Sequence, residues 1–548
     1  MSKLFDELVK KRGFSQSFLE PKYEELPSPW LLPEMREAVG RIREAAKRGE
    51  RVMIYGDYDA DGVTATTVMG EALRLAGLKE VMMMLPDRFK DGYGMSERVV
   101  ERAKEAGVTL VVTVDCGSGN KEVVAKLGEV GVDVIVTDHH ECPEELPAAV
   151  AVVNPKRRDV AKCVPEYEEH LDELMELRDL AGVGVAFMVA RAMVEEGMIP
   201  EGQEKWMLDL VLVGTICDSM RMSEVNRTLC YYGVVVLGKT RRAGLRELMK
   251  TASVKKIDAE SIGFQIGPRL NAAGRMATAE AALKLLNAQS RLEGARCASE
   301  LEKYNLERRN QQTAAMKEFA ERGVPDDKVL VMTGDWHEGV LGIIAGRLAE
   351  DYERPAFVLT EVEQGVFKGS GRSFGEFSLA EALKACGDEI LGGGGHAGAA
   401  GVKVAKEKLE EFRRAVNEYY KSLGLVNQER FLKQAADLVV RELGGFTLDF
   451  MTELEKLEPF GVGNEMPVFE LRDVLVVDKK LMGVEGKHLK LLVRGGDGKM
   501  LKLVGFGVPE AWREVEMGQR VDVLVNVVEA EWNRLKSVEG RILEIRGC

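Results

Sequence analysis

Residues 132–141, with the sequence VDVIVTDHHE, constrain the fold of this chain more than any other stretch. The stretch opens with a short, β-branched apolar run of the kind that forms a buried strand. Asp138, His139, His140 and Glu141 follow the run directly. Four ionisable groups beside a buried strand are costly unless they are compensated, and carboxylate and imidazole are both good metal ligands. The pattern indicates a metal site, whereas a polar loop with two surface histidines is the alternative for this stretch alone.

A second acidic segment, GDYDADG at residues 56–62, lies between a strand-like run and a helical stretch at residues 63–76. Asp57, Asp59 and Asp61 alternate along it, and three such carboxylates repel one another strongly unless a cation lies among them. The pattern favours metal binding over an acidic turn or helix N-terminus, where aspartate is common in any case.

Five short apolar runs alternate with helical stretches in the first part of the chain, at residues 52–55, 81–85, 110–114, 132–136 and 149–153. This alternation predicts an α/β fold with a doubly wound parallel sheet. Ligands of such sheets bind outside the carboxyl ends of the strands. Asp115 follows the third run, so three acidic segments are expected to meet in one crevice.

Asp218 is the predicted last ligand of this site. It follows a ten-residue apolar stretch at residues 207–216. A helix-capping or core-satisfied aspartate is the alternative when the residue is taken alone. Because carboxylates with a single imidazole suit Mn²⁺ or Mg²⁺, we expect two ions of this kind.

Composition limits the class of protein. The chain has 548 residues, of which 45% are hydrophobic, and this length favours three or four domains. No run approaches the ~20 apolar residues of a membrane helix, and the N-terminal residues lack the apolar core of a signal peptide. The eight cysteines form no C-x-x-C pair, which favours reduced thiols in the cytoplasm. At a net charge of −14, a nucleic-acid partner needs a local basic groove or bound cations.

Two later segments are candidate phosphate contacts. Residues 267–275, GPRLNAAGR, interrupt a mostly helical region that ends in a connector helix at residues 295–322. Their alternative is a glycine-punctuated helix start with solvated arginines. A second α/β unit begins near residue 328, and there serine and arginine at residues 370–373, with a glycine run before His396, predict an anion pocket rather than a plain turn.

From about residue 453 the pattern changes to short alternating runs, at residues 474–477, 489–493, 501–506, 521–528 and 542–545. They predict a small antiparallel barrel, with the OB-fold as the natural candidate. Seven basic residues face three acidic ones between residues 478 and 502. We expect DNA contacts here from Lys487, Lys490, Arg494 and Trp532, whereas a solvated β-surface is the alternative.

These residues resemble the DHH phosphoesterase superfamily and, within it, the bacterial RecJ family of single-strand-specific 5′→3′ exonucleases. The motifs that carry the resemblance run nearly end to end: YGDYDADG (55–62), DRFKDGYG (87–94), DHHE (138–141), GPRLNAAGRM (267–276), WHEGVLG (336–342), KGSGRS (368–373), GGGGHAGAAG (392–401) and PFGVGNEMPVF (459–469). Two positions depart from the pattern. Tyr55 stands where many members carry histidine, so Asp57 is the candidate replacement ligand, and Ser219-Met220-Arg221 replaces a more apolar turn that contains proline.

The resemblance implies five regions: an N-terminal helical extension (1–48), a DHH catalytic domain (49–235), a helical region with connector (236–327), a DHH-associated domain (328–425), and linker helices with an OB-fold domain (426–548). It implies metal ligation by Asp57, Asp59, Asp61, Asp115, His139 and Asp218. Asp115 is expected to bridge the ions, His140 to face the phosphate as donor or proton shuttle, and Asp138 to orient an imidazole. The expected substrate contacts are Arg88, Tyr93, Arg269, Asn271, Arg275, Ser370, Arg372, Ser373 and His396.

The implied activity is hydrolysis of single-stranded DNA from the 5′ end to 5′-mononucleotides in recombination and repair. The expected setting is a cytoplasmic monomer without a membrane, with a single-strand-binding protein and a helicase as partners. Two alternatives stay open: a phosphodiesterase for oligoribonucleotides or cyclic dinucleotides, and an inactive replication-factor-like DNA-binding module. The barrel and the long connector argue against the first, and the complete set of acids and histidines argues against the second.

Overall fold

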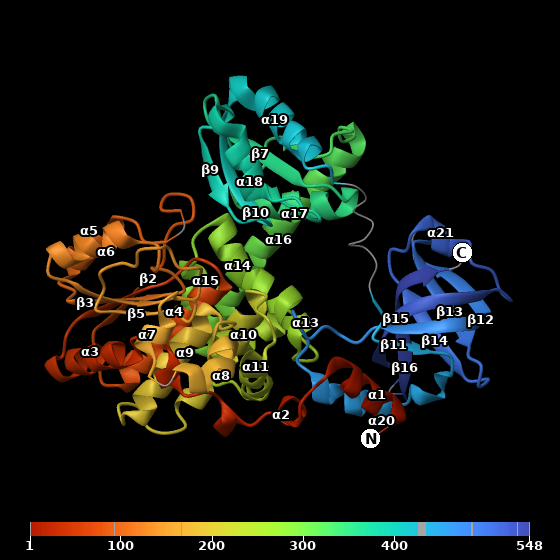
Figure 1. The fold of residues 1–548 in the computed structure, drawn as a ribbon, viewed down its shortest axis with the longest axis horizontal. Coiled ribbons are helices and arrows are strands. Elements are labelled where there is room, and N and C mark those ends of the chain that lie inside the picture. Colours follow the sequence, from red (N-terminus) through yellow and green to blue (C-terminus); the bar gives the residue numbers. More distant parts are fainter. Residues whose placement is uncertain are drawn as a thin grey trace.

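The computed structural model describes residues 2–92, 94–165, 167–425, 435–483, 486–533 and 535–546, and for Trp532 the backbone alone. Its three sheets belong to three lobes joined by helices (Figure 1). The first lobe lies at the left of the view, the second at the top, and the C-terminal barrel at the right. Within the described ranges, no helix combines the length and apolar character needed to span a membrane.

The first sheet is parallel throughout and has the order β2-β1-β3-β4-β5, which confirms the predicted doubly wound fold. Successive strand residues point into two different cores, one shared with α3, α4 and α9 and the other with α5 and α6. The elements are β1 (Val52–Tyr55), β2 (Val81–Met84), β3 (Leu110–Val114), β4 (Asp133–Thr137), β5 (Ala151–Val153), α3 (Met35–Arg48), α4 (Ala60–Leu75), α5 (Arg98–Ala106), α6 (Lys121–Glu129) and α9 (Gly182–Glu195).

The helix after the first acidic segment begins at Ala60, earlier than the predicted residue 63. The reason is a cap: Asp59 Oδ1 accepts the backbone N–H groups of Asp61 and Gly62, each at 3.0 Å. Asp61 therefore lies in the first turn of α4. The second buried helix of this lobe, α10 (Leu208–Cys217), carries Asp218 at its C-terminal end.

Helices connect the first two lobes. Residues 267–275, where a phosphate-contacting loop or a helix start was expected, lie within a helix, α14. The long helix α16 then leads into the second lobe (Figure 1). The remaining helices of the first lobe are α7 (Val160–Cys163), α8 (Leu171–Leu177) and α11 (Glu224–Leu237). Those of the connecting region are α12 (Ala243–Thr251), α13 (Ala259–Ser261), α14 (Gly267–Met276), α15 (Glu280–Leu286) and α16 (Arg291–Arg322).

The second lobe is a mixed sheet of order β6-β7-β8-β10-β9. The glycine run at residues 392–395, expected as a loop, forms its edge strand β9 by antiparallel pairing with β10. Glycine favours a loop by its flexibility, but nothing prevents its backbone from pairing at an edge. The elements are β6 (Leu330–Thr333), β7 (Ala356–Glu363), β8 (Val366–Arg372), β9 (Gly392–Gly395), β10 (Ala399–Ala405), α17 (Leu341–Tyr352), α18 (Leu379–Cys386) and α19 (Leu409–Ser422).

The predicted C-terminal barrel is confirmed, and it closes through pairing of β12 with β15. Several strands are longer than the predicted runs, and β14 pairs with β16 in parallel rather than antiparallel fashion. The elements are β11 (Leu438–Val440), β12 (Phe469–Met482), β13 (His488–Arg494), β14 (Met500–Gly505), β15 (Arg520–Trp532), β16 (Leu535–Arg546), α20 (Leu448–Leu454) and α21 (Glu510–Arg513).

Residues 2–19 pack on the barrel, whereas α3 packs on the first sheet. Phe5 and Leu8 of α1 (Lys3–Arg12), with Phe18 of α2 (Gln16–Leu19), lie in the hydrophobic core of the barrel lobe. Arg12 Nε forms an ion pair with Asp437 Oδ1 at 2.6 Å. The N-terminal extension thus contacts two lobes that lie far apart in the chain.

Arg227 of α11 joins this N-terminal segment to the catalytic lobe. The residue is 1% exposed. Its guanidinium lies 4.2 Å from the centroid of the Phe18 ring, and its Nη2 donates to the backbone carbonyl of Glu458 at 3.1 Å. One buried cation therefore contacts α2 and the segment that enters the barrel.

Replacing Arg227 with alanine should loosen the barrel from the catalytic lobe. The change removes hydrogen bonds to a charged donor, each of which contributes about 1.5–3 kcal/mol. We expect faster protease cleavage between residues 454 and 469 and a lower melting temperature. The matched control is Arg246→Ala, which removes an exposed arginine of α12. Equal cleavage rates for the two variants would contradict this assignment.

Candidate metal centre and anion pocket

Acidic and imidazole side chains converge at the ends of β1, β3 and β4 and at the end of α10. Their ligand atoms form three groups whose members lie within 4.8 Å of one another. The groups are Asp57 with Asp59 and Asp115, Asp61 with His139 and Asp218, and Asp115 with His139 and His140. The structure thus brings together all the residues predicted to hold metal.

Asp115 lies where these groups meet. Its Oδ1 is 3.0 Å from His139 Nε2, and the same residue belongs to the group that contains Asp57 and Asp59. Its backbone is left-handed, with φ +59°, which is strained for a residue other than glycine and typical of functional sites. A Cβ at Gly182 would lie 2.5 Å from the Asp115 Cβ. The glycine therefore lets α9 approach this carboxylate.

Backbone donors of α9 hold Asp61. The N–H groups of Gly182 and Val183 donate to its two carboxylate oxygens at 2.7 and 2.8 Å. The N-terminus of this helix favours negative charge. On the other side, a Cβ at Gly214 of α10 would lie 2.8 Å from Asp61 Oδ1. The close approach of α9 and α10 thus fixes the position of the Asp61 carboxylate.

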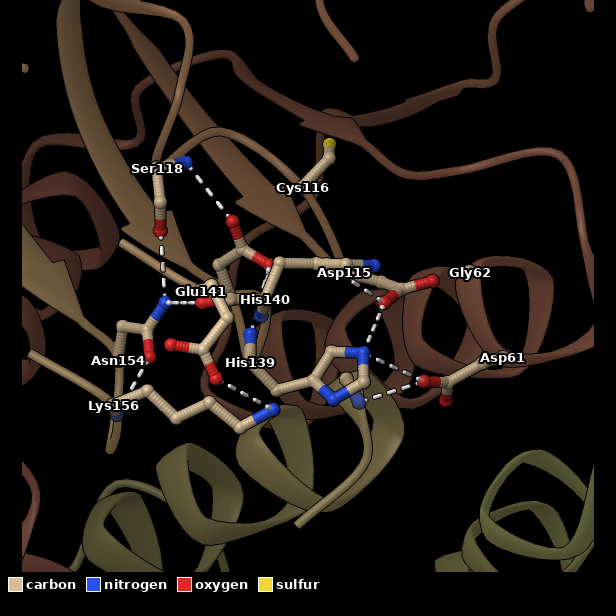
Figure 2. Close-up of polar contacts among 12 residues, drawn as sticks. Asp61, Gly62, Asp115, Cys116, Ser118, His139, His140, Glu141, Asn154 and Lys156 are labelled. Carbon is tan, nitrogen blue, oxygen red and sulfur yellow. Dashed lines mark hydrogen bonds and ion pairs between the residues drawn. The ribbon is translucent and has the colours of Figure 1, made fainter. Parts of the chain in front are cut away.

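Asp138 organises the turn after β4, where Ser118, His140 and Asn154 lie close together (Figure 2). Its Oδ1 accepts the backbone N–H groups of His139 and His140 and lies 2.8 Å from His140 Nδ1, while its Oδ2 accepts the N–H of Ser118 at 2.9 Å. Asn154 Nδ2 donates to Ser118 Oγ and to the carbonyl of His140. Ser118 and Asn154 were not predicted as site residues, although Asn154 directly follows β5, at the same edge as the acids.

Burial and mutual repulsion disfavour ionisation of these carboxylates. Burial first, and then neighbouring carboxylates, raise the pKa values of Asp57, Asp61 and Asp115 well above the ordinary range. The same causes raise the pKa of Asp218 to about 7. Burial, together with the nearby His140, lowers the pKa of His139 to about 3, which keeps its imidazole neutral.

Several buried ligand atoms have no hydrogen-bond partner in the described part of the chain: Asp57 Oδ1, Asp115 Oδ1 and both ring nitrogens of His139. Unsatisfied buried acceptors are costly, and cations would satisfy them. Carboxylates with one neutral imidazole are a donor set for Mn²⁺ or Mg²⁺. The residues present therefore fit two such ions.

For His140, the balance between burial and neighbouring charge shifts the pKa in the other direction from that of His139. Burial disfavours its charged form, but the hydrogen bond and charge of Asp138 outweigh this effect and raise its pKa above the ordinary value. Burial likewise opposes ionisation of Asp138, and His140 outweighs it in turn, so the pKa of Asp138 lies below its usual range. The side chain of His140 is 39% exposed, and its raised pKa favours the protonated imidazole at the border of the acidic cluster.

An arginine cluster lies beside the acids. Arg88 lies 4.9 Å from the centroid of the Tyr58 ring. Burial, with the charges of Arg88 and Arg372, lowers the pKa of Arg275 to about 9, and burial with Arg88 also lowers that of Arg372. Three guanidinium groups from three segments thus repel one another, and an anion among them would relieve this repulsion. A Cβ at Gly342 would lie 3.0 Å from Ser370 Oγ, so this glycine leaves room beside Arg372.

Three other predicted substrate contacts, Arg269, Asn271 and Ser373, have partners within the protein. Arg269 forms an ion pair with Glu302 and donates to the carbonyl of Gln265 at 2.7 Å. Asn271 Oδ1 accepts the backbone N–H of Ala60 at 2.8 Å, so it fixes the start of α4. Ser373 Oγ donates to the carbonyl of Phe377, and His396 is exposed in the turn between β9 and β10. Tyr93 lies outside the described residues.

Three of the four predicted barrel contacts lie on or next to β13, and Trp532 is the last residue of β15. Arg494 is exposed and Lys490 is partly exposed, while Lys487 immediately precedes the strand. The side chain of Trp532 lies outside the described part of the chain. The barrel contacts the catalytic side through other strands, because Arg541 of β16 forms an ion pair with Glu260 at 3.3 Å.

A groove lies between the end of α10, next to Asp218, and the segment that precedes the barrel. It has a volume of about 640 Å³ and is lined by Cys217, Phe264, Arg275, Arg308 and Phe460, among others. Phe264 is 79% exposed. Sequence reasoning missed this residue, because a phenylalanine in a helical stretch is ordinarily assigned to the core. The groove offers an aromatic face and two guanidinium groups next to the acids.

Comparisons with known proteins identify three domains in this chain, in the same order as the three lobes. The chain matches the DHH family, N-terminal domain over residues 51–215, the DHHA1 domain over 326–422, and the RecJ OB domain over 439–544. It is 35% identical over 542 residues to the single-stranded-DNA-specific exonuclease RecJ of Bacillus subtilis, covering 96% of this chain and 66% of the relative. Identity to the RecJ of Dickeya dadantii is 33%, covering 95% of this chain and 93% of the relative.

The structural match spans the whole chain. The crystal structure of RecJ in complex with Mn²⁺ from Thermus thermophilus superposes with a TM-score of 0.83 at 30% identity, covering 100% of this chain and 76% of that one. The Mg²⁺ complex of the same protein gives 0.77 at 27% identity, covering 100% and 75%. Both ions thus occur in a relative of this fold, in agreement with the donor set described above.

Stability without metal should fall as pH rises, because of the raised carboxylate pKa values. An unfolded Asp218 loses its proton near 3.8, whereas the folded one keeps it until about 7, so this group destabilises the folded state progressively across that interval. In EDTA, melting temperatures of wild type and Asp218→Asn should converge at low pH and favour the variant at pH 8. Addition of Mn²⁺ should raise the melting temperature of the wild type more than that of Asp218→Asn. Equal pH dependence of the two proteins in EDTA would contradict the prediction.

Proposed function

Because this chain belongs to the RecJ family of the DHH superfamily, we propose that it is a metal-dependent exonuclease that degrades single-stranded DNA from the 5′ end to 5′-mononucleotides. The observation that carries the proposal is a cluster of buried carboxylates with unsatisfied ligand atoms beside three mutually repelling arginines. In this proposal the acids hold the cations and the arginines hold substrate phosphate. The proposed setting is a cytoplasmic monomer that works in recombination and repair with a single-strand-binding protein and a helicase.

We propose that Asp57, Asp59 and Asp115 hold one ion and that Asp61, Asp115, His139 and Asp218 hold the other. Two divalent cations activate a water, neutralise the non-bridging oxygens and stabilise the leaving oxygen of a phosphodiester. The grouping is supported by Asp115 Oδ1, which is buried, unsatisfied and 3.0 Å from His139 Nε2. Asp138 holds His140 in its protonated form, and His140 donates to the phosphate or to the leaving oxygen.

The polarity of the reaction would come from the arginine cluster. Arg88 and Arg275 come from the first lobe and the helical region, and Arg372 comes from the second lobe, so a terminal phosphate bound among them is held across the two lobes. In this proposal the terminal nucleotide lies between the arginines and the acids, which places the scissile bond one nucleotide inward. Ser370 supports Arg372 in this role, with their nearest polar atoms 3.5 Å apart.

Digestion of 5′- and 3′-labelled single-stranded DNA tests the activity directly. The wild type should release labelled mononucleotide from the 5′ end with Mn²⁺ or Mg²⁺ and show no turnover in EDTA. Asp115→Ala should lower turnover by more than about a hundredfold, since even an outer-shell partner of a metal contributes 10–100-fold. Asp388→Ala, an exposed aspartate of the second lobe, is the control. Release from the 3′ end, or near wild-type turnover of Asp115→Ala, would overturn the proposal.

The terminal-phosphate assignment predicts a difference between two substrates. Arg372→Ala should reduce kcat/KM on 5′-phosphorylated ends about tenfold to a hundredfold, which corresponds to one lost charge-assisted contact of about 1.5–3 kcal/mol. The loss on 5′-hydroxyl ends should be smaller. Arg347→Ala on α17, which removes an exposed arginine paired with Asp351, is the matched control. Equal losses on both ends would assign the terminal phosphate to other residues.

A further inference from the structure

A second concave site lies at the far ends of the helices that carry the metal ligands. The last turn of α4 and the first turn of α10 form part of its wall, and the starts of α12 and α16 complete it. Its volume is about 550 Å³, within the range of small-molecule sites. From Asp61 to Arg74, α4 rises about 20 Å at 1.5 Å per residue, so this pocket is separate from the catalytic crevice.

The lining is basic although the chain is acidic. Five arginines face two carboxylates in the pocket, in a protein of net charge −14. Arg242 lies between both carboxylates, with its Nε 3.1 Å from Asp209 Oδ1 and its Nη2 paired with Glu71 Oε2. Both acids are thus paired with one half-buried arginine, Arg242. Arg291 pairs with Glu247, with its Nε 2.9 Å from Glu247 Oε1, so three of the five arginines remain for a ligand.

The three remaining arginines lack a carboxylate partner among the described residues: Arg74, Arg241 and Arg246. Arg241 lies over the ring of Trp206 at 3.6 Å from its centroid. Within the described part of the chain, the guanidinium of Arg246 donates to the backbone carbonyl of Arg241 alone. In a protein with 90 acidic residues, three unpaired guanidinium groups around one cavity indicate that an anion belongs there.

Two further features match a phosphate-bearing ligand. The nine-residue helix α12 starts at the pocket wall without a side-chain cap, so its first N–H groups and its dipole favour an anion. Leu75, Leu286 and the indole of Trp206 supply an apolar part of the wall, which suits a base or a sugar. A concave site of this size suits a small molecule.

We propose that this pocket binds a nucleotide, with its phosphates on Arg74 and Arg246 and its base or sugar against Trp206. The site is independent of the proposed exonuclease centre, because none of the metal ligands or of the arginines in that centre contributes to it. Its ligand is a nucleoside phosphate, and a bare phosphate chain or an acidic peptide is a competing occupant that the test distinguishes.

Equilibrium dialysis of the full chain in EDTA, with ADP as the probe, tests the proposal. The background carries Arg88→Ala and Arg372→Ala to remove the other arginine cluster. We expect one bound ADP per chain, and at least tenfold weaker binding after Arg74→Ala with Arg246→Ala. The control is Arg36→Ala, an exposed arginine that lies 4.8 Å from the Trp30 ring outside any such pocket. Unchanged affinity in the double variant would overturn the proposal.

Two comparisons settle the nature of the ligand. ADP should bind at least tenfold more tightly than pyrophosphate, and it should change tryptophan fluorescence in Trp30→Phe but not in Trp206→Phe. Equal affinity for pyrophosphate would overturn the nucleotide assignment. An acidic peptide that binds while ADP does not would overturn it as well. Melting curves of every variant confirm that lost binding reflects the pocket rather than unfolding.

Discussion

Repulsion among buried carboxylates is the constraint on which the rest of the first lobe depends. Asp57, Asp61 and Asp115 are at most 3% exposed, and each disfavours ionisation of its neighbours. The chain offsets this locally with the backbone donors of α9 and with the neutral imidazole of His139. Glycines at 182 and 214 then let two buried helices approach the acids closely enough to fix them. The helices that look like plain core are therefore part of the site, and the remaining repulsion is relieved by cations.

Positive charge beside these acids comes from Arg88, Arg275 and Arg372, which belong to three separate segments. Helix α16 and the second lobe bring these segments together. The lobes also touch through aromatic side chains, since the rings of Phe89 and His337 lie 5.4 Å apart at their centroids, nearly perpendicular to each other. The loop that carries Arg88 thus contacts the lobe that carries Arg372. A phosphodiester bound between the arginines and the cation-bearing acids would, together with those cations, relieve two kinds of repulsion. One is the repulsion among the arginines, and the other is the repulsion among the carboxylates. Under the proposed function, this arrangement would link recognition of the strand end to the position of the reacting phosphate, because a shift of one lobe would move both.

The sequence predicted the sheet and the convergence of the acids because both follow from short-range rules. Buried parallel strands read as apolar runs, and their carboxyl ends meet at one edge, so Asp115 and His139 could be placed without coordinates. The start of α4 was wrong by three residues, because the cap by Asp59 depends on side-chain geometry. The glycine strand β9 was missed because glycine reports flexibility rather than pairing. The packing partner of α1 could not be predicted either, since the apolar stripe of Phe5 and Leu8 does not specify which surface covers it. The roles of the individual site residues stay predictions.

The contacts that fix the barrel against the rest of the chain determine which of its strands could bind DNA. Its β16 side faces the helical region through Arg541 and Glu260, and the N-terminal segment with Arg227 fixes the approach to β12. In the closed barrel, β13 is hydrogen-bonded to β12 and β14, whereas β15 and β16 pair with each other on the other side of these strands. A DNA strand that followed the groove past Phe460 would meet the side of β15 and β16 before it reached Lys490 and Arg494. In that arrangement the basic residues on β13 would act only on a strand long enough to pass around the barrel. Short oligonucleotides that ended within the groove would depend on the lobes alone.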